Sequence, residues 1–274
     1  MPQAFKEIVF SNTNQEQQEI LLALLSNLGY DSFLQEENLL KAYVLQSDFN
    51  AEELAQIASA QEVSYTIGDL EQKNWNEEWE KNYEAVIVND KVAVRAHFHE
   101  PIVSSACNII ITPQMSFGTG HHSTTKLMLQ LLSDMRLKDA TVFDYGCGTG
   151  VLGIYTALQG ASLVHMCDID DNCVDNTTSN IALNNAENCS VVCANISDTE
   201  ARQYDIVIAN INLNILTDNM QAMAERVASG GHLLLSGFFT SDAPILESYG
   251  KKYDLTIYRT CNELNWCALH MIKK

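Results

Sequence analysis

Three glycines alternate in one short stretch of the chain, "DYGCGTG" at residues 144–150. A strand-like apolar run precedes Gly146, and a helix-like apolar pattern begins after Gly150. Glycine at such a point permits a tight turn and lets the backbone approach a ligand closely. In a doubly wound sheet, nucleotide cofactors bind at this kind of turn. The stretch therefore predicts a nucleotide-cofactor loop, although a strand-to-helix turn can also need glycines for purely structural reasons.

Two carboxylates near these glycines indicate which cofactor the loop would bind. Asp168 ends the next predicted strand, 20 residues after Gly148, where a carboxylate can accept hydrogen bonds from ribose hydroxyls. Asp144 directly precedes the glycines, where it would oppose the pyrophosphate that a dinucleotide brings to a helix N-terminus. S-adenosylmethionine has no phosphate and carries an ammonium and a sulfonium. We therefore predict S-adenosylmethionine, with a nicotinamide cofactor as the alternative.

A second glycine-rich loop, "SFGTGHHSTTKLMLQ" at residues 116–130, runs directly into a predicted helix. Thr124 and Thr125 place hydroxyls near the start of that helix, where they either cap it or contact the ligand. Phe117, between small residues, is interpreted as a lid over the cofactor. The two histidines of the loop are adjacent and point apart, so we expect no shared metal there.

A further polar residue, Asn210, ends the strand-like run "DIVIAN" and is expected to face the transferred methyl group or its acceptor. Methyltransferases that act on planar amino groups often continue from this asparagine with two prolines and an aromatic residue. Here Ile211, Asn212 and Leu213 follow instead. The sequence thus permits an aliphatic amine as the acceptor and disfavours a flat base or amide.

A sheet is needed to bring these residues together. Over residues 101–274, strand-like and helix-like segments alternate, which predicts an α/β, doubly wound Rossmann-like domain. Residues 1–71 follow the order strand, helix, two strands, helix, strand, which is typical of a small α+β ferredoxin-like domain. Residues 72–100 are predicted to be the linker, in which Trp75 and Trp79 pack a short acidic helix and a hairpin follows.

The net charge of the chain is strongly negative, at −19 for 274 residues. Residues 1–80 hold 15 acidic and three basic residues, so less than a third of the chain carries most of the excess. Because nucleic-acid affinity depends largely on Lys and Arg, this surface disfavours a nucleic acid as partner and attracts a basic protein. A charge that serves only solubility is the alternative.

The cysteines and the N-terminus indicate a cellular compartment. Eight cysteines include no CxxC pair, and several lie in apolar runs, so we expect reduced thiols and no metal site. The start "MPQAFKEIVF" lacks the basic and long apolar regions of a signal peptide. No apolar segment approaches membrane-spanning length. These features predict a cytoplasmic protein with no membrane partner.

The chain resembles the ribosomal protein L-eleven methyltransferases, the PrmA family. Six segments share that family's order and spacing: "FGTGHHSTT", "DYGCGTGVLGI", "CDIDDNCVDN", "VIANINLNIL", "LSGF" and "NWCAL". The resemblance is strong over residues 72–274 and covers residues 1–71 only as a pattern of elements. It implies an N-terminal domain that grips the ribosomal protein, and a catalytic domain that methylates lysine side chains and the α-amine repeatedly, to the trimethyl state. By position, it implies contacts with S-adenosylmethionine for Thr125, Gly146, Asp168 and Asn210, with Gly148 beside them.

The reaction that this resemblance implies needs a neutral amine. A free lysine amine has a pKa of about 10.4, and burial beside a cation lowers that value. Nothing in the sequence identifies a general base, so the catalytic residue stays unassigned and positioning is expected to supply much of the rate. Asn74 and Ser123 depart from residues that are common in the family, but neither change removes a needed group.

Overall fold

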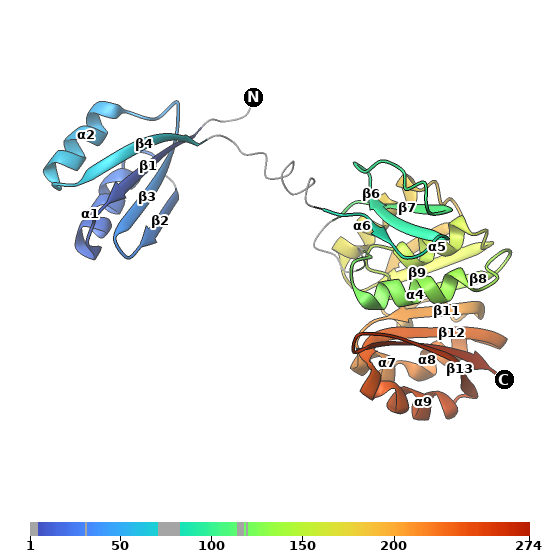
Figure 1. Cartoon of the computed structure of the whole chain (residues 1–274). Helices are drawn as coiled ribbons and strands as arrows, with labels where there is room; N and C mark the ends of the chain where they lie inside the picture. Colours follow the sequence, from blue (N-terminus) through green and yellow to red (C-terminus); the bar gives the residue numbers. More distant parts are fainter. Residues whose placement is uncertain (1–4, 31, 71–82, 114–117, 119) are drawn as a thin grey trace. The chain divides into compact units, whose positions relative to one another are not determined.

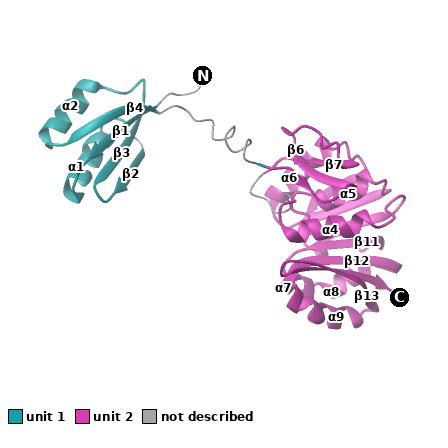
Figure 2. Cartoon of the chain, viewed as in Figure 1, with its two compact units in different colours: residues 1–83 teal, residues 84–274 magenta. Residues whose placement is uncertain are grey.

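The computed structural model divides the chain into two compact units, Met1–Tyr83 and Glu84–Lys274 (Figure 2). Its elements are labelled in Figure 1. The predicted helix with Trp75 and Trp79 and the predicted lid at Phe117 lie outside the described residues. The structure describes residues 5–30, 32–70, 83–113, 118 and 120–274.

The smaller unit is a four-stranded antiparallel sheet with two helices. Its elements are β1 (Phe5–Ser11), α1 (Gln15–Ser26), β2 (Ser32–Glu36), β3 (Leu39–Leu45), α2 (Ala51–Ala60) and β4 (Ser64–Leu70). The strands lie in the order β2-β3-β1-β4, and every pair is antiparallel. Alternate strand residues such as Ile8 and Phe10 are fully buried in one core with Leu21 of α1 and Leu54 of α2. Asn50 caps α2, because its side chain accepts from the N–H groups of Glu52 and Glu53.

The larger unit is built on a seven-stranded sheet. In chain order it comprises α4 (Ser123–Ser133), β8 (Thr141–Tyr145), α5 (Val151–Leu158), β9 (Leu163–Asp168), α6 (Asp171–Leu183), β10 (Cys189–Cys193), β11 (Tyr204–Asn210), α7 (Leu213–Asp218), α8 (Met220–Arg226), β12 (Val227–Phe239), α9 (Ala243–Lys251), β13 (Leu255–Glu263) and β14 (Trp266–Lys273). The strand order is β10-β9-β8-β11-β12-β14-β13, and only the pairs that include β14 are antiparallel. The doubly wound, mostly parallel sheet is therefore confirmed. The order reverses between β8 and β11, where such sheets form a crevice.

Helices cover both faces of this sheet (Figure 1). On one face, α4 and α5 share a core with strand residues such as Val142 and Leu234. On the other face, α7, α8 and α9 pack against residues such as Phe143 and Leu235. Successive side chains of a strand point to opposite faces, so neighbours Val142 and Phe143 enter different cores. The sheet is thus buried on both faces, so a ligand can reach it only at the ends of its strands.

Part of the predicted linker belongs to the larger unit. Within residues 84–100 the chain forms β5 (Val86–Ile87) and β6 (Val92–Ala96), an antiparallel pair to which β7 (Cys107–Ile111) adds in parallel. The sequence pattern places β7 in the main sheet, but it lies in this separate three-stranded sheet. The reason is an asparagine after α6: Asn184 accepts from the Ile110 N–H at 2.8 Å and donates to its carbonyl at 2.6 Å. The Asn184 side chain thereby makes the backbone hydrogen bonds that a neighbouring strand would otherwise make with Ile110 of β7.

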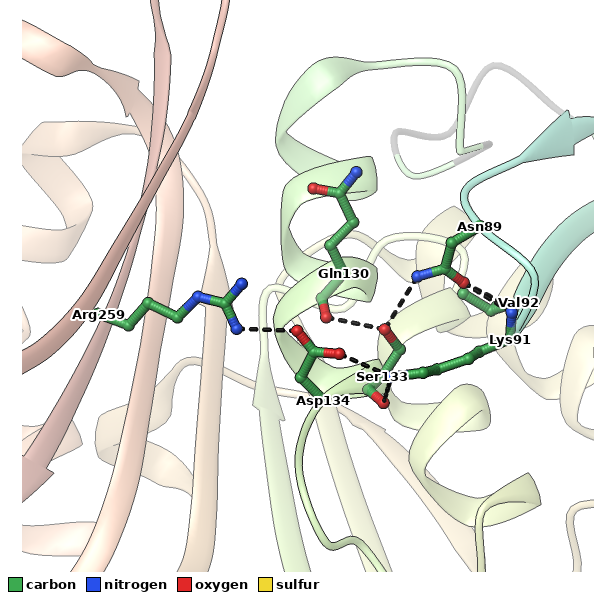
Figure 3. Close-up of polar contacts among 7 residues, drawn as sticks. All are labelled: Asn89, Lys91, Val92, Gln130, Ser133, Asp134 and Arg259. Atoms are coloured by element: carbon green, nitrogen blue, oxygen red, sulfur yellow. Dashed lines mark hydrogen bonds and ion pairs between the residues drawn. The ribbon is translucent and has the colours of Figure 1, made fainter.

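A polar cluster joins the small sheet to the main one at the end of α4 (Figure 3). Asp134 accepts from Lys91 Nζ at 2.7 Å and from Arg259 Nη1 of β13 at 2.8 Å. Asn89 donates to Ser133 Oγ at 3.0 Å. The two cations lower the pKa of the Asp134 carboxyl, with the bond to Lys91 as the larger cause. Three elements that are distant in the sequence are therefore held together at one helix end.

Candidate active site

A cavity of about 440 Å³ opens where the strand order reverses, at the carboxyl ends of β8, β9 and β11. We call it the main cavity. Its volume is in the range of small-molecule sites. No Lys or Arg is among the described residues that line it. All five residues that the sequence predicted as ligand contacts lie on its wall: Thr125, Gly146, Gly148, Asp168 and Asn210.

The glycine loop between β8 and α5 forms one wall of the main cavity. Gly146, Gly148 and Gly150 all have positive φ, at 70°, 57° and 75°. A Cβ atom on Gly146 would overlap with Cγ2 of Ile211, so this position needs glycine for space as well as for conformation. The Gly146 N–H donates to the carbonyl of Cys167 at 2.9 Å, which fastens the loop to the end of β9.

Asp168, the last residue of β9, ties the same loop to its strand. One carboxylate oxygen accepts from the Gly148 N–H at 2.9 Å, and the other accepts from the Asp170 N–H at 3.1 Å. A carboxylate offers about four acceptor positions, so about two remain for hydroxyl groups in the cavity. The position fits the predicted contact with ribose, and the bond to Gly148 adds a structural task that the sequence did not indicate.

Asp144 does not have the role that the sequence argument gave it. Its side chain is 1% exposed, is absent from the described wall of the main cavity, and accepts from the Gly153 N–H of α5 at 3.0 Å. Burial raises its pKa to about 7, and the charge of Asp168 adds to that rise. Asp144 therefore anchors α5 to β8, and the structure does not support a direct action on a bound pyrophosphate, because the carboxyl is enclosed and does not line the main cavity.

Thr125 and Asn210 meet on the far wall of the main cavity. Asn210 Nδ2 donates to Thr125 Oγ1 at 3.4 Å, and Thr125 is fully buried in α4. The Asn210 Oδ1 atom is buried without a hydrogen-bond partner in the structure. An unpaired buried acceptor is costly, so an atom with this placement is poised to receive a donor from a ligand. Thr124 instead bonds His122 Nδ1 at 2.8 Å and serves the start of α4.

The loop before α4 is held against the glycine loop by a buried threonine. Thr149 Oγ1 donates to the carbonyl of Gly118 at 2.8 Å. Asn180 Nδ2 of α6 donates to the Thr149 carbonyl at 2.9 Å. This chain of bonds fixes both glycine-rich segments to one helix, so the two loops form a common rim.

Several residues that line the main cavity were not predicted as site residues from the sequence, and Gly237 and Trp266 are two of them. Gly237 lies at a bulge of β12 with φ of 96°, and a Cβ there would overlap with the carbonyl of Ile211. Trp266 opens β14, and its ring meets His122 edge-on at 4.7 Å between centroids. Both lie in segments that carried the family resemblance, "LSGF" and "NWCAL", which was the one available signal.

The residues of the main cavity fit S-adenosylmethionine. Its wall combines the carboxylates of Asp168 and Asp170, the unpaired oxygen of Asn210 and no described cation, which suits a ligand with an ammonium and a sulfonium. Asp168 would hold the ribose, and Gly146 and Gly148 would lie against the ligand. Among the described residues, no group of three or more His, Cys, Asp or Glu could hold a metal ion. No helix in the described part of the chain is long and apolar enough to cross a membrane.

Comparisons with known proteins identify the family of the chain. The family model of the ribosomal protein L11 methyltransferases (PrmA) matches residues 6–274. A ribosomal protein L11 methyltransferase from Porphyromonas gingivalis is 41% identical over 258 residues, which are 92% of this chain and 89% of that protein. One from Bacteroides fragilis is 36% identical over 261 residues, 93% of each chain. The crystal structure of a ribosomal protein L11 methylase from Lactobacillus delbrueckii subsp. bulgaricus shares the fold, with a TM-score of 0.64 at 24% identity over 70% of this chain and 98% of that one. The chain therefore belongs to the ribosomal protein L11 methyltransferase (PrmA) family.

Proposed function

We propose that this protein transfers methyl groups from S-adenosylmethionine to lysine side chains and to the N-terminal α-amine of ribosomal protein L11, up to the trimethyl state. The observation that carries the proposal is the unpaired, buried Oδ1 atom of Asn210 on the wall of a cavity whose described lining contains no Lys or Arg. Membership of the family supplies the class of substrate. Another protein, an RNA or a small molecule as acceptor is the alternative, and the net charge of −19 disfavours RNA.

S-adenosylmethionine supplies a methyl carbon bonded to a sulfonium. The lone pair of a neutral acceptor amine forms the N–C bond while the C–S bonding pair leaves with sulfur, and the new ammonium then loses a proton to water. Each further round needs that deprotonation, so trimethylation requires a site that leaves the amine free to turn. Asn210 suits this need, since one amide oxygen can orient an N–H without enclosing the nitrogen.

The residues around the reaction act by position rather than by proton transfer. Asp168 and the glycine loop hold the adenosyl part, Thr125 fixes the amide of Asn210 through the bond at 3.4 Å, and Asn210 orients the reacting groups. The sulfonium of the bound donor would disfavour an ammonium next to it, which lowers the pKa of the acceptor amine and raises its neutral fraction at the point of transfer. Placement of reactants in the correct geometry can supply much of the rate. We assign no general base.

The smaller unit is proposed to be a ferredoxin-like domain that recognises the ribosomal protein. The strand order β2-β3-β1-β4 with two helices supports the fold assignment. Helices α1 and α2 carry acidic residues such as Glu16, Glu19, Glu52 and Glu53 and contain no Lys or Arg. A basic partner would be attracted to this surface, and added salt would weaken the attraction because it screens charges beyond about 8 Å. Since the substrate is ribosomal, we place the enzyme in the cytoplasm.

Radiolabelled methyl donor, incubated with the protein and purified large ribosomal subunits, tests this function. Label on one protein of the size of L11 is the expected result, and mass spectrometry of that band identifies the lysines and counts the methyl groups. The Gly146→Val variant is the matched negative control, because the added side chain collides with Ile211 at the glycine loop. Label on RNA would favour the alternative, and no label on any fraction would refute the activity.

A further inference from the structure

A second hollow adjoins the main cavity. Its volume is about 410 Å³, and we call it the side groove. Asn212, Gly237 and Trp266 line both spaces, so the two lie side by side. A further hollow of about 350 Å³ extends from it past Phe239 and Asn265. The three hollows follow one another along the carboxyl end of β12.

The side groove owes its shape to the bulge at Gly237. The pairing of β12 with β14 shifts register between Ser236 and Phe238, and such bulges redirect the side chains that follow. After the bulge, Phe238 is 2% exposed and enters the core, whereas Phe239 is 48% exposed. Phe239 pairs with Trp266 across the strands, and their rings stack with centroids 4.5 Å apart at 29°. A continuous aromatic wall therefore faces the groove.

The charge of the groove is negative. Asp242 lines it, and its carboxylate accepts from the Phe239 N–H at 3.0 Å, so the charge is fixed beside the aromatic pair. No Lys or Arg is among the described residues that line this groove or its extension. An aromatic face with a carboxylate beside it is the combination that binds ammonium groups, methylated ones included.

We propose that the side groove is the acceptor subsite, in which the Phe239–Trp266 stack and the carboxylate of Asp242 bind an aliphatic ammonium, namely a lysine side chain and its methylated forms. The proposal rests on the proposed function for the identity of the acceptor. The unbranched stem lies along the aromatic wall, and the amine reaches the main cavity at the shared residues. Affinity for a methylated ammonium retains a partly modified lysine between rounds of transfer.

Binding of small probes to the full chain tests this subsite separately from catalysis. The probes are N-acetyl-trimethyllysine amide and neutral N-acetyl-norleucine amide, each titrated with saturating S-adenosylhomocysteine and followed by saturation-transfer NMR. The first is expected to bind and the second to bind at least tenfold more weakly. Phe239→Ala and Asp242→Asn should each weaken the first about three- to tenfold, the range expected for one cation–π or charge contact. Asparagine keeps an acceptor for the Phe239 N–H, so the turn is preserved.

Leu183→Ala is the matched control, because Leu183 is exposed at the end of α6 and does not line the groove. The Leu183→Ala variant should bind the cationic probe as tightly as the unmodified protein does. Thermal unfolding checks that every variant is folded. Equal binding of the two probes, or unchanged binding in either groove variant, overturns the proposal. So does a failure of the unmodified protein to bind the cationic probe. Intact probe binding without methylation of L11 would count against the proposed function and leave the subsite standing.

Discussion

Replacement of Asp168 by alanine gives the sharpest test of the donor site. Two acceptor positions of its carboxylate are used by the N–H groups of Gly148 and Asp170, which leaves about two for ligand hydroxyls. Hydrogen bonds to a charged group contribute about 1.5 to 3 kcal/mol each. Loss of two such bonds at the lower value is about 3 kcal/mol, which raises the dissociation constant more than a hundredfold. Release of the Gly148 N–H should also lower the free energy of unfolding by about 1 to 3 kcal/mol.

Calorimetric titration with S-adenosylmethionine and with S-adenosylhomocysteine measures the effect of this substitution. Both ligands carry the same ribose, so Asp168→Ala should weaken both equally. Asp170→Ala is the matched control, since it removes the same charge from the same cavity wall and affects only a cap of α6. Its effect should stay below about threefold, as expected for an exposed charge. A loss confined to the sulfonium ligand, or an equal loss in both variants, would refute the ribose contact and leave only a general charge effect.

Three further substitutions probe the fold around the site. Gly146→Val combines a φ of 70° with a collision at Ile211, and should lower the unfolding free energy in urea by about 2 to 5 kcal/mol; a change below 1 kcal/mol would mean the turn tolerates a side chain. Asp134→Ala removes ion pairs to Lys91 and Arg259 and should cost about 0.5 to 2 kcal/mol, less at high salt; a salt-independent effect would contradict this. The pKa of His270 is lowered to about 4. Burial is the largest cause, and the charges of His232 and Arg259 add to it. The neutral ring therefore stabilises the fold above about pH 6.5, and this stabilisation is lost as pH falls toward 4. Urea midpoints at pH 7 and pH 5 should differ more for the unmodified protein than for His270→Gln, and equal differences would exclude His270 as a cause.

Local sequence patterns predicted the part of the site that forms at strand ends. Asp168 and Asn210 each follow a buried apolar run, and the carboxyl ends of parallel strands meet at one edge of the sheet, so their proximity could be expected. The hairpin turn before β6 followed from an equally local signal.

The remaining features depend on contacts between segments that are far apart in the chain. Strand β7 lies outside the main sheet because Asn184 satisfies its backbone, and no periodicity shows this. The burial of Asp144 depends on how α5 packs, since its partner is the N–H of Gly153. Trp266 enters the site only because β14 lies between β12 and β13, a pairing that residue alternation cannot specify.

The place of β14 in the sheet has a consequence for synthesis of the protein. A nascent chain that has grown to residue 250 already contains the glycine loop, Asp168 and Asn210, yet β12 would still be an open edge, since its outer neighbour is β14. Trp266 follows Gly146 by 120 residues and completes the wall that both cavities share. A growing chain of this protein that has not reached Trp266 therefore lacks part of the wall of the main cavity and one ring of the stacked aromatic pair.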